Sequence, residues 1–487
     1  MQEAKARVWA LEEFGAAQLG DRRRTARLVA MAARAAEKPA GRVSCVFETD
    51  AERQGAYDLL ETKPVTAAAI GEAMAAATVE RVQDLPWVVV AIDGSSLTLP
   101  NHSGRKDFGR IGSYRGKAVQ GGGNGLKVIS SLAIDPSGTP VGLVDQQWWV
   151  RTNDPKRAVA RGAQKKQRIK RTPLAEKETQ RWLDAILASE RRFRDGAATL
   201  GRCYVLDREA DARPVLTTLA ATGQAFVVRA SWDRRIEPLD RSKGKREYLR
   251  LRMARMPVLG TYVLNVDPGP ARTARRAQMV VRAGSVTLQM RDAHRRKRVT
   301  RITLQVVWAR EVGTAPAKEK AIDWMLLTNQ SAHTFERALD VIRTYAMRWR
   351  IEDFHRAWKS GHCDVEAMQL RSAAAAMKWA TVLAAVAART ERLKLLARSQ
   401  PDDPASIELT KTEIRVLIVL KRDQKKKTET IPDTTPTIGQ ATLWIAELGG
   451  YTGKSSGGPP GSTTIGRGLA KVRAAANLLR LLKVSEK

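Results

Sequence analysis

Three carboxylates stand at positions where an uncompensated charge is costly. Asp93 closes the apolar run WVVVAID, Asp207 follows the apolar run RCYVL, and Glu352 lies within YAMRWRIEDFHRAWK, which has helical spacing. A buried acid needs a compensating partner, and a divalent cation is one such partner. Two or three carboxylates suffice for Mg²⁺, which prefers oxygen ligands and keeps several waters. The three acids together predict a site for two Mg²⁺ ions that could support phosphoryl transfer. Each acid alone could equally cap a turn or pair with an arginine.

Four polar residues around Glu352 share one helical spacing. Tyr345, Glu352 and Lys359 are seven residues apart, and Arg348 lies three residues after Tyr345. Seven residues nearly complete two turns of an α-helix, so the four side chains are expected on one face of a single helix over about 334–359. This face could be a row of phosphate-binding groups beside a metal-binding carboxylate. It could also be a salt-bridged surface.

The surrounding pattern alternates strands and helices. Helical spacing dominates residues 1–70, 174–192 and 372–398, and a final helix is expected near the C-terminus. Between them, short runs rich in β-branched residues predict strands, with a further series of strand-like runs over 230–310. The expected strands are 87–93, 127–135, 140–150, 202–206, 225–229 and 324–328.

The charge balance points to a polyanionic partner. The chain has 487 residues and a formal net charge of +33, from 84 Lys and Arg against 51 Asp and Glu. Its hydrophobic content of 43% can build a large core, which excludes a wholly disordered basic tail. Four blocks carry much of the excess, and nucleic acid is the partner that such blocks favour. A coding bias toward arginine is the competing explanation. The basic blocks span 151–171, 234–255, 272–301 and 421–427.

The cysteine count and the lengths of the apolar segments narrow the class of protein further. Three cysteines are too few for a disulfide framework or a cysteine-rich zinc module, which suits a reducing cytoplasm. No signal peptide is apparent, and the longest apolar stretch, 380–388, is about half a membrane span. The sequence therefore predicts a cytoplasmic, nucleic-acid-binding protein that does not span a membrane.

These motifs together resemble those of a known family. The spacing Y-(2)-R-(3)-E-(6)-K, the run DREAD at 207–211 and the run AIDGSSL at 91–97 are similar to those of DDE transposases of the insertion-sequence-four family. Further similar stretches, in the same order, are LGDRRRTARLV at 19–29, VGLVDQQWWVR at 141–151, FVVR at 226–229, WMLLT at 324–328 and IAELGGYTGKSSGGPPG at 445–461.

The resemblance implies a multidomain α/β architecture. It implies a helical N-terminal domain at 1–70 that recognises transposon ends, and an RNase H-like catalytic domain at 71–370. The catalytic core is expected to be a mixed sheet flanked by helices, with an all-β insertion at about 230–325. A mostly helical C-terminal domain at 371–487 is expected to mediate dimerisation.

The resemblance also implies an activity and roles for individual residues. The activity is cut-and-paste transposition of double-stranded DNA by a homodimer in a synaptic complex, in a bacterial cytoplasm. It proceeds by Mg²⁺-dependent nicking at the terminal inverted repeats, hairpin formation and resolution, and transfer of the 3′-OH into target DNA, with Mn²⁺ as a possible substitute metal. The implied metal ligands and catalytic residues are Asp93, Asp207 and Glu352, and the implied DNA-binding residues are Tyr345, Arg348, Lys359, Trp324 and Arg229.

Several alternatives stay open. Trp324 matches a tryptophan expected to stack on a flipped base, but it could as well be a core aromatic on a strand. The chain could also be a non-catalytic DNA-binding derivative or inhibitor, or a metal-dependent nuclease without strand transfer. His355, His362 and Cys363 lack a zinc-binding pattern and are interpreted as structural or surface groups.

Overall fold

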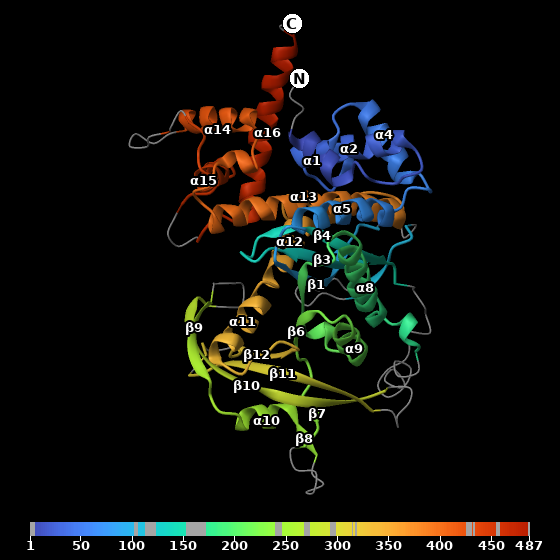
Figure 1. Cartoon of the computed structure of the whole chain (residues 1–487). Coiled ribbons are helices and arrows are strands. Elements are labelled where there is room, and N and C mark those ends of the chain that lie inside the picture. The colour runs from blue at the N-terminus through green and yellow to red at the C-terminus, as the bar shows by residue number, and fades with distance from the viewer. Residues whose placement is uncertain are drawn as a thin grey trace.

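A twelve-stranded mixed sheet forms the centre of the computed structural model (Figure 1). The structure describes residues 5–101, 106–112, 123–151, 172–238, 246–266, 273–292, 299–313, 315–316, 319–424, 431, 434–453 and 458–485. Of the basic blocks, residues 152–171, 239–245, 272, 293–298 and 425–427 lie outside these described ranges.

Strand β1 occupies the middle of the first half of the sheet. It pairs antiparallel with β3 on one side and parallel with β5 on the other, and β5 continues in parallel to β6. Its first residues are almost entirely buried, as expected for β-branched residues covered on both faces. The strand runs five residues beyond Asp93, farther than the apolar pattern predicted. The bounds are β1 Trp87–Thr98, β2 Gly109–Gly112, β3 Gly123–Ile134, β4 Pro140–Trp149, β5 Gly201–Leu206 and β6 Ala225–Arg229.

The segment expected to be an all-β insertion extends this same sheet. Strand β12 pairs with β6, and β11 and β10 follow as a long antiparallel pair. The segment is β-rich rather than all-β, because it contains the helix α10. The bounds are β7 Arg235–Ile236, β8 Glu247–Tyr248, α10 Leu249–Arg255, β9 Gly260–Val266, β10 Arg275–Arg291, β11 Val299–Glu311 and β12 Asp323–Thr328.

Helices cover both faces of the sheet. Alternate residues of β1 enter two different cores: Val88, Val90 and Ile92 pack with α8 and α9, whereas Val89 and Ala91 join the core that contains α11, α12 and α13. The bounds are α8 Thr179–Gly196, α9 Arg213–Ala221, α11 Phe335–Ala346, α12 Trp349–Lys359 and α13 Ala373–Ser399.

The prediction of a single helix over 334–359 is wrong, because the structure has two helices there. Helix α11 ends at Ala346 and α12 begins at Trp349. The two residues between them keep right-handed helical angles. The amide of Arg348 bonds three residues back, as in a 3₁₀ turn, and that of Met347 is shared between the carbonyls three and four residues back.

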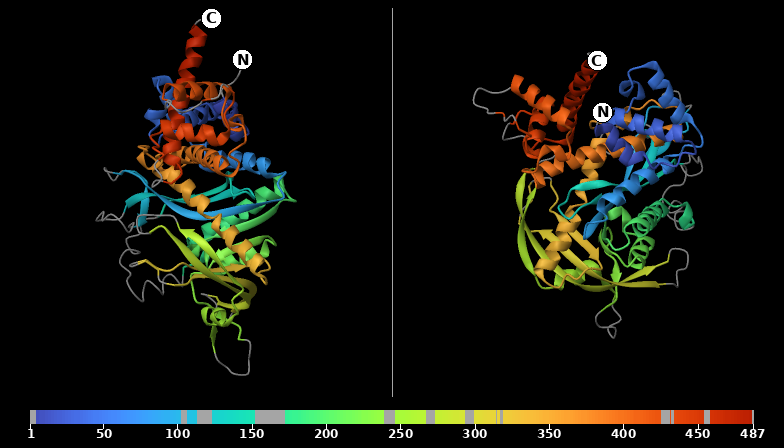
Figure 2. Two further views of the ribbon diagram at one scale, coloured as in Figure 1. Left: turned by 90° about the vertical axis from the view of Figure 1, so that its left-hand side faces the viewer. Right: turned by 45° about the horizontal axis from the view of Figure 1, so that its top comes forward.

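Two further groups of helices lie on the far side of α13 from the sheet (Figure 1). Helix α13 and α5 lie side by side above β4, and the N-terminal and C-terminal helices stand next to one another above them, as the turned views also show (Figure 2). The N-terminal bounds are α1 Lys5–Phe14, α2 Arg22–Glu37, α3 Val43–Val46, α4 Asp50–Glu61 and α5 Ala67–Val82. The C-terminal bounds are α14 Lys411–Asp423, α15 Ile438–Leu448 and α16 Ser462–Ser485.

Helix α13 bonds to both of these groups. Near its start, Lys378 Nζ donates to the carbonyl oxygens of Leu60 and Thr62, at 2.7 and 2.9 Å, and Trp379 Nε1 donates to Gly41 O at 2.8 Å. Near its end, Lys394 Nζ donates to Ser462 Oγ at 2.9 Å at the start of α16. The N-terminal helices, one face of the sheet and much of α13 share one hydrophobic core. In the described part of the chain, none of the helices is both long and apolar enough to cross a membrane.

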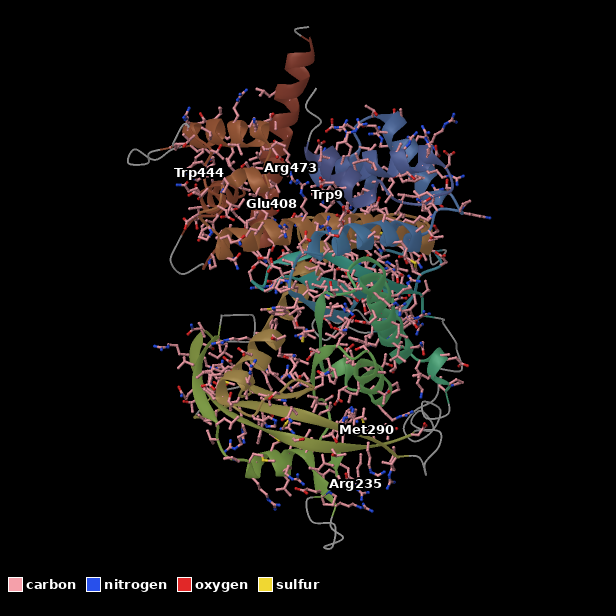
Figure 3. The ribbon with its side chains drawn as sticks, in the orientation of Figure 1. Trp9, Arg235, Met290, Glu408, Trp444 and Arg473 are labelled. Carbon is pink, nitrogen blue, oxygen red and sulfur yellow. The ribbon has the colours of Figure 1, made fainter. Side chains whose placement is uncertain are left out.

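Figure 3 shows where the two helical groups face one another, with the labelled side chains of Trp9, Glu408 and Arg473 between them. Arg473 on α16 donates to the backbone oxygen of Ala36 at the end of α2 and to Glu413 on α14, the latter at 3.2 Å. The two helical groups are therefore joined directly as well as through α13.

Candidate active site

Two of the predicted acids lie where the parallel pairing of β1 with β5 ends, Asp93 within β1 and Asp207 directly after β5. Ile92 of β1 lies opposite Leu206 of β5, so Asp93 and Asp207 are the next residues along each strand. The carboxyl ends of parallel strands form a common edge, at which side chains from different loops converge. The strand pairing thus brings together two acids that are 114 residues apart in the sequence (207 − 93).

Glu352 joins this edge through a buried arginine. Arg348 precedes α12, and its side chain is 3% exposed. Its Nη2 donates to Glu352 Oε1 at 2.6 Å, and its Nη1 lies 3.8 Å from Asp93 Oδ2. The pKa of Arg348 is raised, because Tyr345 and the three acids outweigh the opposing effect of burial. One guanidinium therefore lies between the acids of β1 and α12.

Asp207 has its own pair of partners. Tyr345 Oη donates to Asp207 Oδ1 at 3.0 Å, and Arg229 Nη1 at the end of β6 lies 3.8 Å from the same oxygen. Tyr345 is 1% exposed, and burial together with the Asp207 charge raises its pKa to about 12. The tyrosine is therefore a neutral hydrogen-bond donor to Asp207.

The pKa of Asp93 is strongly perturbed by its surroundings. Burial raises its pKa to about 7, and the negative charges of Glu352 and Asp207 add to the increase. The Arg348 charge and a hydrogen bond from Gly94 N, 2.9 Å long, oppose it. Strongly perturbed carboxylates of this kind gather at functional sites. The three acids interact although they come from three separate segments.

The acids nevertheless do not form a ready-made metal cluster. Within the described residues, no group of three or more His, Cys, Asp and Glu side chains is arranged to hold a metal ion. Arg348 lies between Asp93 and Glu352, and Tyr345 bonds to Asp207. The donor set still suits Mg²⁺ chemically, because carboxylate oxygens are its preferred ligands. A divalent charge would also compensate the burial and the repulsion that raise the pKa of Asp93.

Of the four residues predicted to form a row of phosphate-binding groups or a salt-bridged surface, Tyr345 and Arg348 are buried, and Glu352 and Lys359 are half-buried. Tyr345 and Arg348 both face acids of the sheet edge. Lys359 is 20% exposed, and its Nζ lies 3.7 Å from Glu366 Oε1. Because the basic groups bind acids of the same chain, the face is an internal ion-pair network in this conformation.

Trp324 is packed as a core aromatic in this structure. It is 8% exposed on β12, and its ring lies edge-on to Tyr345 with the ring centres 5.7 Å apart. Of the two interpretations left open for this residue, core packing describes the present conformation. Its role in base stacking stays a prediction.

His355 is a site residue that the sequence interpretation missed. It is 8% exposed, and its Nδ1 lies 4.0 Å from Asp93 Oδ2. Burial, with the positive charges of Lys359 and Arg348, lowers its pKa to about 3, so the ring is neutral. The spacing Glu352-x-x-His355 is the signal that could have found it, since residues three apart share a helix face.

Two protein-family models match parts of the chain. Residues 6–65 match the transposase DNA-binding model, and residues 172–388 match the transposase DDE domain model. The second match contains Asp207 and Glu352, and Asp93 precedes it. The mixed sheet with its flanking helices is consistent with the RNase H-like core of such a domain.

These two matches indicate the class of protein to which the chain is similar. The chain carries a transposase DNA-binding domain followed by a transposase DDE domain, which supports a DDE transposase with DNA as its partner. DDE transposases generally use divalent metal ions.

Proposed function

We propose that this chain is a cut-and-paste DNA transposase of the insertion-sequence-four branch, similar to the transposon-five transposase. The observation that carries the proposal is the meeting of Asp93, Asp207 and Glu352 around Arg348 at the carboxyl edge of the parallel strands. The family matches supply the substrate class, which is DNA. The substrate is the terminal inverted repeats of the element, and the enzyme acts as a homodimer on DNA in the bacterial cytoplasm.

The metal would be held by Asp93, Asp207 and Glu352. Two Mg²⁺ ions, when bound, would supply an activated oxygen nucleophile and stabilise the leaving oxygen of the phosphodiester. For these acids to hold metal ions, Arg348 has to give up its contacts with Asp93 and Glu352. A guanidinium freed in this way is suited to a phosphate oxygen, because its fork of donors binds phosphates as it binds carboxylates.

The other side chains of the site would position DNA. Arg229 and Tyr345 flank Asp207, where they can donate to phosphate oxygens next to the scissile bond once that carboxylate is otherwise compensated. Lys359, beside Glu366, would add a further phosphate contact. Trp324 would need to leave its packing against Tyr345 before it could stack on a flipped base.

The reaction sequence would be nicking by water, hairpin formation by the freed 3′-OH, resolution of the hairpin, and transfer of the 3′-OH into target DNA. His355 lies 4.0 Å from Asp93 and is neutral, so it adds no positive charge that would repel a metal ion.

A nicking assay tests the proposal. The substrate is a labelled duplex carrying the inverted repeat that flanks the gene, and the reaction is followed with and without Mg²⁺ or Mn²⁺. Wild-type protein should nick at the repeat only with metal, and Asp93→Ala, Asp207→Ala and Glu352→Ala should each abolish nicking. Asp340→Asn is the matched control, because Asp340 is an exposed carboxylate on α11.

A second assay distinguishes transposition from plain cleavage. Precut ends are incubated with supercoiled plasmid, and joined product is measured. Joined product supports the transposase, whereas nicking without joining would identify a nuclease. Nicking that survives loss of any of the three acids would show that the metal assignment is wrong.

A further inference from the structure

Trp232 exposes an indole ring to solvent on a firmly held backbone. The residue is 66% exposed, which is unusual for the largest apolar side chain, although single exposed hydrophobic residues are common. It lies in the loop that follows β6, three residues beyond Arg229. What distinguishes this tryptophan is how the backbone around it is fixed.

A buried carboxylate holds the Trp232 loop. Asp211 is 3% exposed, and its Oδ2 accepts hydrogen bonds from Ser231 N at 2.7 Å and from Trp232 N at 3.2 Å. Its other oxygen accepts from Arg234 Nε and Nη2, at 3.0 and 2.5 Å. Both oxygens of one buried acid are thus used to fix the turn that carries the tryptophan.

The ends of the same turn are fixed as well. Ala230 N donates to Met325 O on β12 at 2.7 Å, and Asp233 accepts from Arg250 N in α10 at 2.8 Å. Five consecutive residues, 230–234, are therefore bonded to β12, to Asp211 or to α10. The backbone is ordered in advance, so contact with a ligand would cost it little conformational entropy.

The turn lies at the edge of the sheet that holds the acids. Strands β5 and β6 are parallel neighbours, so the Asp207 loop and the Trp232 loop emerge at the same end. Arg229, 3.8 Å from Asp207, begins the segment that leads to Trp232. Three residues of extended chain span at most about 11 Å, which places Trp232 within one or two nucleotides of this arginine.

We propose that Trp232 stacks on an unpaired base of the DNA next to the cleavage site. The proposal rests on the proposed function, which supplies DNA as the substrate. An aromatic face beside basic groups is the usual platform for an unstacked base, because every base has a π face and the cations hold its phosphate. Trp324 cannot take this part in the present conformation, since it is packed against Tyr345.

A fluorescent DNA tests the proposal. The probe is a forked duplex with two unpaired 2-aminopurines at its end, titrated with full-length protein in EDTA so that the DNA is not cut. Wild-type protein should quench the 2-aminopurine, and Trp232→Ala should abolish the quenching and weaken binding about tenfold. Trp232→Phe should retain most of both effects. Tyr248→Ala, another exposed aromatic of this region, is the matched control and should behave as wild type.

The salt dependence of binding distinguishes stacking from charge. Trp232→Ala should leave the slope of log K against log salt unchanged, because no phosphate contact is lost. Unchanged quenching and affinity in Trp232→Ala would overturn the inference. So would equal losses in Trp232→Phe and Trp232→Ala with a lowered melting temperature, which would show that the ring serves packing. Failure of wild-type protein to bind any DNA would overturn the proposed function together with this inference, whereas binding without dependence on Trp232 would overturn the inference alone.

Discussion

Replacing Asp93 by asparagine should stabilise the metal-free protein while it abolishes activity. In the folded chain the pKa of Asp93 is raised from 3.8 to about 7, mainly by burial and then by the charges of Glu352 and Asp207. A raised carboxyl pKa means that the folded state binds the proton more tightly than the unfolded state does. Stability is therefore lost as the pH rises from about 4 to about 7.

The structure gives the size of this effect. The difference between the two pKa values, 7 − 3.8 = 3.2 pH units, corresponds to about 4 kcal/mol at 1.36 kcal/mol per unit. Asparagine keeps an oxygen for the Gly94 N hydrogen bond and carries no charge. The variant should therefore gain most of this free energy above pH 7 and almost none near pH 4.

Urea denaturation in EDTA, from pH 4 to 8.5, measures the effect. The difference in unfolding free energy between Asp93→Asn and wild type should grow with pH and level off above about pH 7. Asp340→Asn is the control, because an exposed ion pair contributes only about 0–1 kcal/mol. A difference that stays flat with pH, or shrinks as the pH rises, would refute the reasoning that burial and neighbouring acids hold the Asp93 proton.

Three further changes should follow from contacts described above. Arg348→Met should destabilise the metal-free protein by about 3 kcal/mol, because Glu352 and Asp93 lose their shared cation; equal melting temperatures would argue against that pairing. Trp379→Phe should lower the unfolding free energy by about 1–3 kcal/mol through loss of the bond to Gly41 O, measured in urea, and no change would mean that this bond does not hold the N-terminal helices. DNA affinity should fall steeply with salt, with a log–log slope near −5 or steeper if six or more phosphates are contacted, and a slope near −1 would show that most of the +33 charge does not touch DNA.

Strand positions were predictable because a strand that is buried on both faces appears in the sequence as a continuous apolar run. The run 87–93 is continuous and β-branched, and it forms the buried start of β1. The five further residues of β1, from Gly94 to Thr98, contain no apolar run and were therefore not predicted as strand. They are extended because they pair with β3. The turn between α11 and α12 was not predictable either, because neither Met347 nor Arg348 is a residue type that breaks helices.

The acids of the site were predictable, but their partners were not. Strand ends and helical spacing single out Asp93, Asp207 and Glu352 without knowledge of the fold. The hydrogen-bond partner of Tyr345 is Asp207, which is 138 residues away, and no local pattern contains that relation. In the same way, the backbone amide of Trp232 bonds to Asp211, which is 21 residues away in the sequence.

The contacts of α13 with the N-terminal helices also affect how the chain folds while it is being synthesised. Lys378 and Trp379 bond to residues 318 and 338 positions earlier in the chain. At a synthesis rate of roughly 5–20 residues per second, the N-terminal helices would wait about 15–70 s on the ribosome before this partner emerges. During that interval, the apolar surface that α13 later covers has to be shielded by other means. A chain that is stopped before residue 373 should therefore depend on chaperones far more than the finished protein does.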